Sequence, residues 1–147
     1  MGKYQLWTDG SARAHTGKGG SWAYVIVKGE DAIAKGVGAE TETTNNRMEL
    51  KSVIEGLKRF DPLNAEVEVV SDSAYVINCF KQKWFVSWRA NNWRNSEGRE
   101  VKNRDLWEEL LAVVETFTHP IKWTHVRGHV GHKWNEICDQ MCSDVYK

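Results

Sequence analysis

The N-terminal part of the chain carries stretches of apolar, β-branched and aromatic side chains that are separated by turn-forming residues. Residues 4–9 predict a strand that ends at the turn-former Asp9-Gly10-Ser11. A glycine-bearing segment at 17–20 leads into a second predicted strand, 21–27, and a weaker third strand fits 31–39. Because short turns join antiparallel strands, we expect an antiparallel meander.

Beyond residue 43 the spacing of apolar residues changes to that of helices, interrupted by short β-rich runs. The run Thr43-Thr44-Asn45-Asn46 offers cap residues, apolar positions recur behind it at helical intervals, and Pro62 ends that helix. The elements predicted after it are a strand at 67–72, a helix from Ser73, a helix with a basic, tryptophan-rich loop at 81–103, a helix at 106–117 with Asn103 as its cap, a strand at 121–126, and a final helix with Trp134, Ile137, Met141 and Val145 on one face.

This order of elements indicates the fold class. Three strands followed by helices that alternate with two more strands predict an α/β protein with a mixed sheet covered by helices on both faces. Functional sites in such sheets gather beyond the carboxyl ends of central strands. Asp9 and Asp72 both fall at predicted strand ends, which makes them candidates for one site.

Length and composition are those of one globular domain. The chain has 147 residues, 41% of them hydrophobic and 27% charged, and no apolar stretch approaches a membrane span. No signal-peptide pattern precedes the first predicted strand, so we expect a cytoplasmic protein whose cysteines are reduced. Cys138 and Cys142 share a helical face and are expected to be small buried side chains.

The charge of the chain is unevenly distributed although its net value is zero. Residues 81–104 hold two acids and seven basic residues, namely Lys81, Lys83, Arg89, Arg94, Arg99, Lys102 and Arg104. The excess of five positive charges in this segment is balanced by five negative charges elsewhere. A basic lobe beside an acidic body suits a protein that binds a phosphate backbone and cations on different surfaces.

Four acids fall on different predicted elements: Asp9, Glu49, Asp72 and Asp139. Each alone has an ordinary explanation, such as a turn, a helix dipole, a cap or a solvated helix face. Together they fit phosphodiester hydrolysis, in which bridging carboxylates hold two divalent ions ~3.5–4 Å apart. Mg²⁺ prefers such hard oxygen ligands. Spacing alone leaves open whether the four converge.

Four segments follow one another along the chain in a recognisable order. They are Thr8-Asp9-Gly10-Ser11, then Thr43-Thr44-Asn45-Asn46-Arg47-Met48-Glu49-Leu50, then Ser71-Asp72-Ser73, and finally Gly128-His129-Val130-Gly131-His132 with Asn135-Glu136-Ile137-Cys138-Asp139. In sequence and order these segments resemble the motifs of type 1 ribonuclease H. The resemblance runs from about residue 4 to the C-terminus. It implies the family's fold, a five-stranded mixed sheet with three antiparallel and then two parallel strands, in one domain over 1–147 with a basic protrusion at about 81–104.

The resemblance also implies an activity and its catalytic residues. The metal-binding carboxylates correspond to Asp9, Glu49, Asp72 and Asp139, and the mobile catalytic histidine corresponds to His129. The implied reaction is endonucleolytic hydrolysis of the RNA strand of RNA/DNA hybrids with two Mg²⁺ ions, for which Mn²⁺ is a substitute. It leaves a 5′-phosphate and a 3′-hydroxyl. His129 would assist proton transfer or product departure.

Substrate contacts are implied at further positions. Asn45 and Asn46 have the amide functions to recognise the 2′-hydroxyl of RNA, and the basic protrusion would bind the DNA strand. The substrate-binding set is Ser11, Thr44, Asn45, Asn46, Trp84, Trp88, Lys102 and Asn103. The tryptophans could instead form a small core, and the basic residues a solvated face. The expected partner is an RNA/DNA hybrid, bound by a monomer with no membrane and no obligatory protein partner.

Three positions depart from the family pattern. Glu42 stands where some members carry a basic residue, and His15 and Ala74 replace polar amides, so substrate affinity and cleavage preference are open.

An integrase- or resolvase-like DNA nuclease on the same fold is the main alternative. A zinc module using His129, His132, Cys138 and Cys142 would leave Asp9, Glu49 and Asp72 unexplained. Nothing in the sequence supports an inactive hybrid-binding protein.

Overall fold

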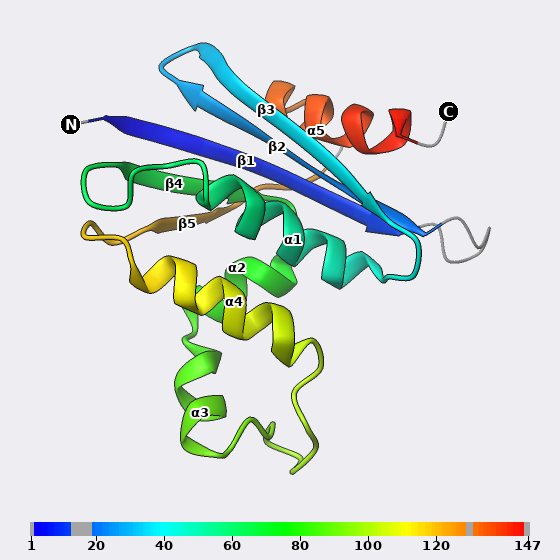
Figure 1. Ribbon diagram of the computed structural model, residues 1–147, viewed down its shortest axis with the longest axis vertical. Coiled ribbons are helices and arrows are strands. Elements are labelled where there is room, and N and C mark those ends of the chain that lie inside the picture. The colour runs from blue at the N-terminus through cyan, green and yellow to red at the C-terminus, as the bar shows by residue number, and fades with distance from the viewer. Residues whose placement is uncertain (1, 13–18, 129–130, 146–147) are drawn as a thin grey trace.

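The structure is a computed structural model that describes residues 2–12, 19–128 and 131–145. Its centre is one five-stranded sheet with strand order β3-β2-β1-β4-β5 (Figure 1). Strands β1, β2 and β3 pair antiparallel, and β4 and β5 add to β1 in parallel. This confirms the expected mixed sheet. The strands are β1 Lys3–Ala12, β2 Gly20–Lys28, β3 Asp31–Glu40, β4 Glu66–Ser71 and β5 Lys122–His125.

Helices lie on both faces of the sheet, as the order of elements predicts. They are α1 Asn45–Leu57, α2 Ala74–Lys81, α3 Trp84–Ala90, α4 Arg104–Glu115 and α5 Lys133–Asp144. The larger core packs α1, α2 and α4 against one face. A smaller core packs α5 against the other. No helix in the described part of the chain is long and apolar enough to cross a membrane.

The smaller core contains the two cysteines that the sequence predicts to be buried. Cys138 is 0% exposed and its thiol donates to the Trp7 carbonyl at 3.4 Å. Cys142 is 2% exposed, and burial raises the pKa of its thiol to about 12. Both side chains therefore act as small apolar groups that fasten α5 to β1.

The helix caps differ in part from expectation. The Thr44 hydroxyl caps α1 by accepting from the Arg47 N–H at 3.3 Å, so neither Asn45 nor Asn46 is needed for this role. The Ser73 hydroxyl caps α2, so the Asp72 carboxylate is not needed as its cap. Asn103 does occupy the N-cap position of α4, but its side chain makes no capping bond. The expectation for Asn103 was wrong in this respect, because its amide is engaged elsewhere.

The basic segment 81–104 projects away from the sheet as α3 and the loop that follows it (Figure 1). Its tryptophans pack against one another at the edge of the larger core. Trp93 is buried, and Trp88 lies between it and Trp107, with ring centroids 5.9 and 5.4 Å away. Trp84 and Trp88 remain half-buried. The alternative that these aromatics pack into a core is thus confirmed.

A close approach of two backbones brings α1 onto the end of β1. A Cβ built at Gly10 would lie 2.3 Å from the Met48 carbonyl carbon and 2.5 Å from the Glu49 nitrogen. These atoms are backbone and cannot rotate away, so only glycine permits this contact. The contact matters because Asp9 and Glu49 flank it on the two elements.

We expect Gly10→Ala to lower the free energy of unfolding by about 2–4 kcal/mol, because overpacking forces backbone shifts. Urea denaturation measures this change. The control is Gly29→Ala, where φ is +66° and nothing lies within 4 Å, so only backbone strain of about 1 kcal/mol is expected. Equal effects of the two substitutions would contradict the close approach.

Candidate metal centre and substrate surface

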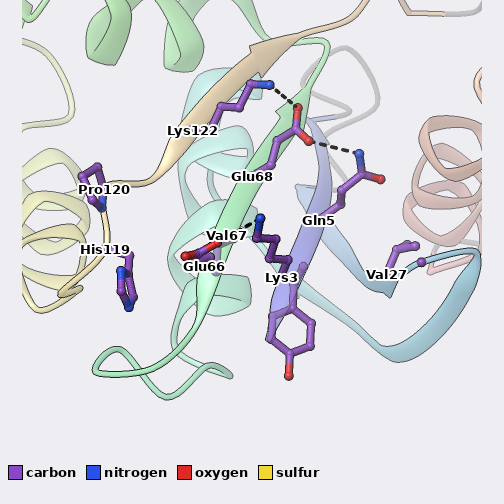
Figure 2. Close-up of a pocket in the computed structure, with 11 residues that line it drawn as sticks. Lys3, Gln5, Val27, Glu66, Val67, Glu68, His119, Pro120 and Lys122 are labelled. Atoms are coloured by element: carbon purple, nitrogen blue, oxygen red, sulfur yellow. Dashed lines mark hydrogen bonds and ion pairs between the residues drawn. The ribbon is translucent and has the colours of Figure 1, made fainter. Parts of the chain in front are cut away.

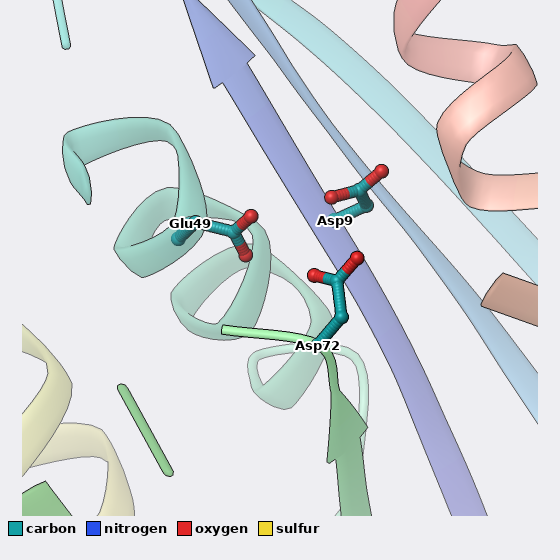
Figure 3. Close-up of side chains that lie close together, drawn as sticks. All are labelled: Asp9, Glu49 and Asp72. Atoms are coloured by element: carbon teal, nitrogen blue, oxygen red, sulfur yellow. The ribbon is translucent and has the colours of Figure 1, made fainter. Parts of the chain in front are cut away.

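Three acidic side chains converge at the carboxyl ends of β1 and β4. Asp9 lies near the end of β1, Asp72 directly follows β4, and Glu49 comes from the first half of α1 (Figure 3). Carboxylate oxygens from these three residues all lie within 4.8 Å of one another. The sheet register explains the convergence, because Thr8 and Ser71 are the last paired residues of β1 and β4.

The surrounding chain holds the first and third carboxylates in place. The Gly10 N–H donates to Asp9 Oδ1 at 2.9 Å. The amide of Asn135 on α5, which is 3% exposed, donates to Asp72 Oδ2 at 3.4 Å. The His125 ring nitrogen Nε2 lies 3.1 Å from the Asp72 carbonyl oxygen. These contacts fix the two aspartates without neutralising them.

The electrostatics of the cluster favour a bound cation. Burial, followed by the charges of Asp9 and Asp72, raises the pKa of Glu49 well above its usual range. Burial and the charge of Asp72 raise the pKa of Asp9 to about 7. Glu49 Oε2 is buried and has no hydrogen-bond partner among the described residues. A divalent cation would supply the missing partner and the missing positive charge, so the residues fit a metal with hard oxygen ligands.

The other two expected catalytic residues are Asp139, which lies beside the cluster, and His129. Asp139 lies on α5, is half-buried, and its negative charge contributes to the raised pKa of Asp9. It therefore borders the cluster, although the convergent group itself comprises Asp9, Glu49 and Asp72. His129 lies outside the described residues, as does His15.

A separate hollow lies away from the acidic cluster. It has a volume of about 620 Å³ and is lined by residues from the start of β1, including Lys3 and Gln5 (Figure 2). Ion pairs Lys3–Glu66 and Lys122–Glu68, both 3.9 Å, give it mixed charge. Asp9 lies near the opposite end of β1, so this hollow is separate from the acidic cluster.

Three of the expected substrate-binding residues, Ser11, Asn45 and Asn46, lie at the end of β1 and the start of α1. The Ala12 N–H donates to Asn45 Oδ1 at 2.6 Å, which ties the start of α1 to the end of β1. This bond takes one of the two acceptor sites of that oxygen, so Asn45 keeps one acceptor site together with its NH₂ group. Asn46 is exposed and Ser11 is half-buried.

The basic lobe has fewer free cations than its sequence suggests. Arg89 makes a bidentate pair with Glu115 at 2.8 and 2.9 Å. Arg94 donates to the Gly98 carbonyl at 3.1 Å, and Arg104 to Glu108 at 3.2 Å. Within the described part of the chain, the basic residues of this lobe with no such partner are Lys81, Lys83, Arg99 and Lys102.

The zinc alternative does not fit the cysteines. The Cys142 thiol lies 3.7 Å from the Asp9 carbonyl oxygen and 3.8 Å from that of Ser21, and the Cys138 thiol faces the Trp7 carbonyl. Both sulfur atoms therefore point into the sheet. Among the described residues, the metal-compatible group is the acidic one.

Sequence reasoning missed two residues that support the site. Asn135 precedes Asp139 by one helical turn, so its spacing was an available signal. His125 carried no signal, because its contact with the Asp72 carbonyl depends on the pairing of β5 with β4.

Comparisons with known proteins agree with this geometry. The model of the ribonuclease H family, described as RNase H, matches residues 1–147. A ribonuclease H of Caldicellulosiruptor saccharolyticus is 43% identical over 148 residues, covering 100% of this chain and 98% of the relative. A ribonuclease H of Thermoanaerobacter sp. is 41% identical, covering 97% of this chain and 89% of the relative.

Solved structures share the fold. A crystal structure described as a type 1 RNase H with the type 2 active-site motif superposes with a TM-score of 0.83 and 26% identity, covering 99% of this chain and 72% of that one. A foamy viral protease-reverse transcriptase in complex with an RNA/DNA hybrid gives a TM-score of 0.83 at 18% identity, covering 96% of this chain and 19% of that one. The second likeness concerns the fold alone.

The crowding of the carboxylates predicts a pH-dependent stability in EDTA. Because the pKa of Asp9 is raised from 3.8 to about 7 on folding, its ionisation destabilises the folded protein progressively across that pH range. We expect Asp9→Asn to raise the free energy of unfolding by about 2–4 kcal/mol at pH 8 and by less than about 1 kcal/mol at pH 4. Denaturation at both pH values is the measurement, with the exposed Glu136→Gln as control. An increase in the free energy of unfolding that is the same at both pH values would contradict the proposed repulsion among the carboxylates.

Proposed function

Because this chain belongs to the ribonuclease H family, we propose that it hydrolyses the RNA strand of RNA/DNA hybrids by a two-metal-ion mechanism. Membership makes the chain a metal-dependent nuclease of RNA/DNA hybrids. The identity of the ion, the chemistry of the ends and the role of each residue are the proposal. The observation that carries it is the convergence of Asp9, Glu49 and Asp72 around a buried carboxylate oxygen that has no partner.

Each acidic residue has a role that its position suits. Asp9, Glu49 and Asp72 would together hold two Mg²⁺ ions, and Asp139 would complete the ligand set from α5. When bound, the ions activate the attacking water and neutralise charge on the phosphoryl and leaving oxygens. Mn²⁺ is the expected substitute. The products would carry a 5′-phosphate and a 3′-hydroxyl.

His129 is proposed as the mobile catalytic histidine. It follows β5, which pairs with β4 beside Asp72, and it precedes α5, which carries Asp139. An imidazole with an ordinary pKa can accept or release a proton near neutral pH. Its role would be to assist proton transfer or product departure at the scissile phosphate.

Substrate recognition would divide between two surfaces. Asn45 and Asn46, with Ser11 and Thr44, lie at the start of α1 and the end of β1, where the NH₂ of Asn45 can donate to groups of the minor groove. The second surface, formed by Trp84, Trp88, Lys102 and Asn103, would bind the DNA strand. Exposed Glu42 supplies no positive charge, so the free lysines of the lobe would carry more of the phosphate binding.

The organisation of the protein completes the proposal. We propose one catalytic domain over 1–147 with the basic protrusion at about 81–104, active as a monomer without an obligatory partner. Three free cysteines suit a reducing compartment such as the cytoplasm. The main alternative is an integrase- or resolvase-like nuclease that cuts duplex DNA.

A gel assay separates these functions. End-labelled RNA/DNA hybrid, duplex DNA and duplex RNA are incubated with the protein in Mg²⁺, Mn²⁺ or EDTA. Metal-dependent cleavage confined to the RNA strand of the hybrid is the expected result. Cleavage of duplex DNA would favour the integrase-like alternative, and binding of the hybrid without cleavage would indicate an inactive binder.

The same assay tests the metal ligands. Asp9→Asn removes one ligand charge with little change in volume, so we expect cleavage to fall by about 10³-fold or more while hybrid binding persists. Glu136→Gln is the matched control, because Glu136 is exposed on the helix that carries Asp139. Near-normal turnover by Asp9→Asn would exclude the proposed role of this residue.

The ion pairs of the lobe predict which cations bind phosphate. We expect Lys83→Ala combined with Lys102→Ala to weaken hybrid binding and to lower the slope of log affinity against log salt by about 2. Arg89→Ala should change the slope little, because Arg89 is already paired with Glu115. Fluorescence anisotropy titrations over a salt series measure both. An unchanged slope in the double lysine variant would show that these lysines are solvated and do not contact phosphate.

A further inference from the structure

The main chain at Asp72 is held in place by the neighbouring strand β5. The ring Nε2 of His125 lies 3.1 Å from the Asp72 carbonyl oxygen, and the Val126 N–H donates to the Ser71 carbonyl at 2.9 Å. Because a carbonyl oxygen only accepts hydrogen bonds, His125 presents an N–H at Nε2. With the main chain restrained on both sides of the residue, rotation of the side chain decides where the two carboxylate oxygens of Asp72 point.

Asn135 restrains that rotation. Its amide Nδ2 donates to Asp72 Oδ2 at 3.4 Å, and the amide must face Asp72 in this sense because an ionised carboxylate only accepts. Asn135 is 3% exposed, so the bond to Asp72 offsets part of the cost of burying its amide. Turning Oδ2 away would leave a buried donor without a partner, which costs free energy.

Gly128 approaches the same oxygen. A Cβ built at Gly128 would lie 2.8 Å from Asp72 Oδ2 and 3.5 Å from Asp72 Cγ, so the chain passes directly against Oδ2. Among the described residues, no donor bonds to Oδ1 of Asp72. The two oxygens of this carboxylate are therefore unequal, because Oδ2 is engaged and crowded while Oδ1 is available to a ligand.

The packing of α5 fixes the position of Asn135. Asn135 lies in the first turn of α5, one turn before Cys138, which is 0% exposed and whose thiol donates to the Trp7 carbonyl at 3.4 Å. Asp139 follows Asn135 by one turn on the same helix. One helix, anchored on β1, thus carries one of the proposed metal ligands and the donor that orients another.

The inequality of the two oxygens bears on the choice of cation. Mg²⁺ demands a near-ideal octahedron of ligands at about 2.0–2.1 Å, and a carboxylate enters such a shell most easily through one oxygen. Ca²⁺ accepts 6–8 oxygen ligands at about 2.3–2.6 Å and takes carboxylates through one oxygen or both. A carboxylate with one oxygen tied back suits the smaller ion, whereas a carboxylate that rotates freely also suits the larger.

We propose that Asn135 is a positioning residue that restricts Asp72 to one metal-binding oxygen, Oδ1, and thereby favours Mg²⁺ over Ca²⁺ at the acidic cluster. This inference rests on the proposed function, because it takes Asp72 as a metal ligand. Asn135 acts through Asp72 and does not itself contact the cation. Outer partners of this kind commonly contribute about 10–100-fold to metal affinity or activity.

The test measures the binding of metal alone, without substrate or turnover. Free Mn²⁺ is followed by its EPR signal during titration of the protein, and Mg²⁺ or Ca²⁺ is then added to displace the bound Mn²⁺. In Asn135→Ala, Mg²⁺ affinity should fall by about tenfold and Ca²⁺ affinity by less than about twofold. The ratio of the two affinities should therefore shift toward Ca²⁺ by about fivefold or more.

A merely structural role predicts a different pattern. If Asn135 only stabilised α5, its loss would weaken the binding of both ions by the same factor, and that result would overturn the proposal, as would unchanged affinities. Cys138→Ala is the matched control, because it loosens the same helix on β1 at a side chain that bonds to Trp7, and it should leave the ratio unchanged. If Asn135→Ala does not fold, Asn135→Leu carries the same test, because it keeps a branched side chain without a donor.

Failure of this inference is distinguishable from failure of the proposed function. A wild type that neither binds Mn²⁺ nor cleaves the hybrid would remove the proposed function itself. A wild type that does both, with the same ratio of Mg²⁺ to Ca²⁺ affinity in the Asn135 variant, would remove only the role of Asn135.

Discussion

Repulsion among buried carboxylates is the constraint on which the functional half of this structure depends. Asp9 and Glu49 are 7% and 8% exposed, and their oxygens lie within 4.8 Å of each other and of Asp72. Holding like charges this close costs free energy, so the fold around them must be rigid. The central strand β1, paired on both sides, provides that rigidity, and the Gly10 contact presses α1 against its end. A bound cation would relieve this repulsion, and the relief would contribute to the free energy of cation binding.

The opposite face of the sheet contributes through α5. Its buried cysteines pack against the β1 backbone at Trp7 and Asp9, and its polar positions carry Asn135 toward Asp72 and Asp139 toward Asp9. One helix thus packs the smaller core and completes the acidic site. The tryptophans of the lobe at 81–104 pack into the larger core, and its lysines stay on the surface.

Much of the fold follows from the sequence because it depends on local periodicity. The strands, the helix behind Thr44 and the position of Asp72 after a strand were predictable, and Glu49 followed from the resemblance. The expected turn at Asp9-Gly10-Ser11 was wrong, because these residues pair with β2 and β1 continues to Ala12. The hydrogen-bond partners were not predictable, because they depend on residues far apart in the chain. The sequence gives no sign that Arg89 is paired, yet its guanidinium donates to the carboxylate of Glu115, 26 residues away. Asn103 looks like an ordinary cap, but its φ of 63° and its bonds to Arg47 and Tyr75 give it another role.

The central claim is that Asp9, Glu49 and Asp72 form one divalent-cation site in this protein. The most direct measurement is a crystal structure of the protein soaked in Mn²⁺, with anomalous scattering used to locate the ion. The account predicts an anomalous peak at coordination distance, about 2.0–2.3 Å, from oxygens of these carboxylates, including the otherwise unpartnered Glu49 Oε2. Well-ordered crystals whose Mn²⁺ peaks all lie elsewhere would contradict it.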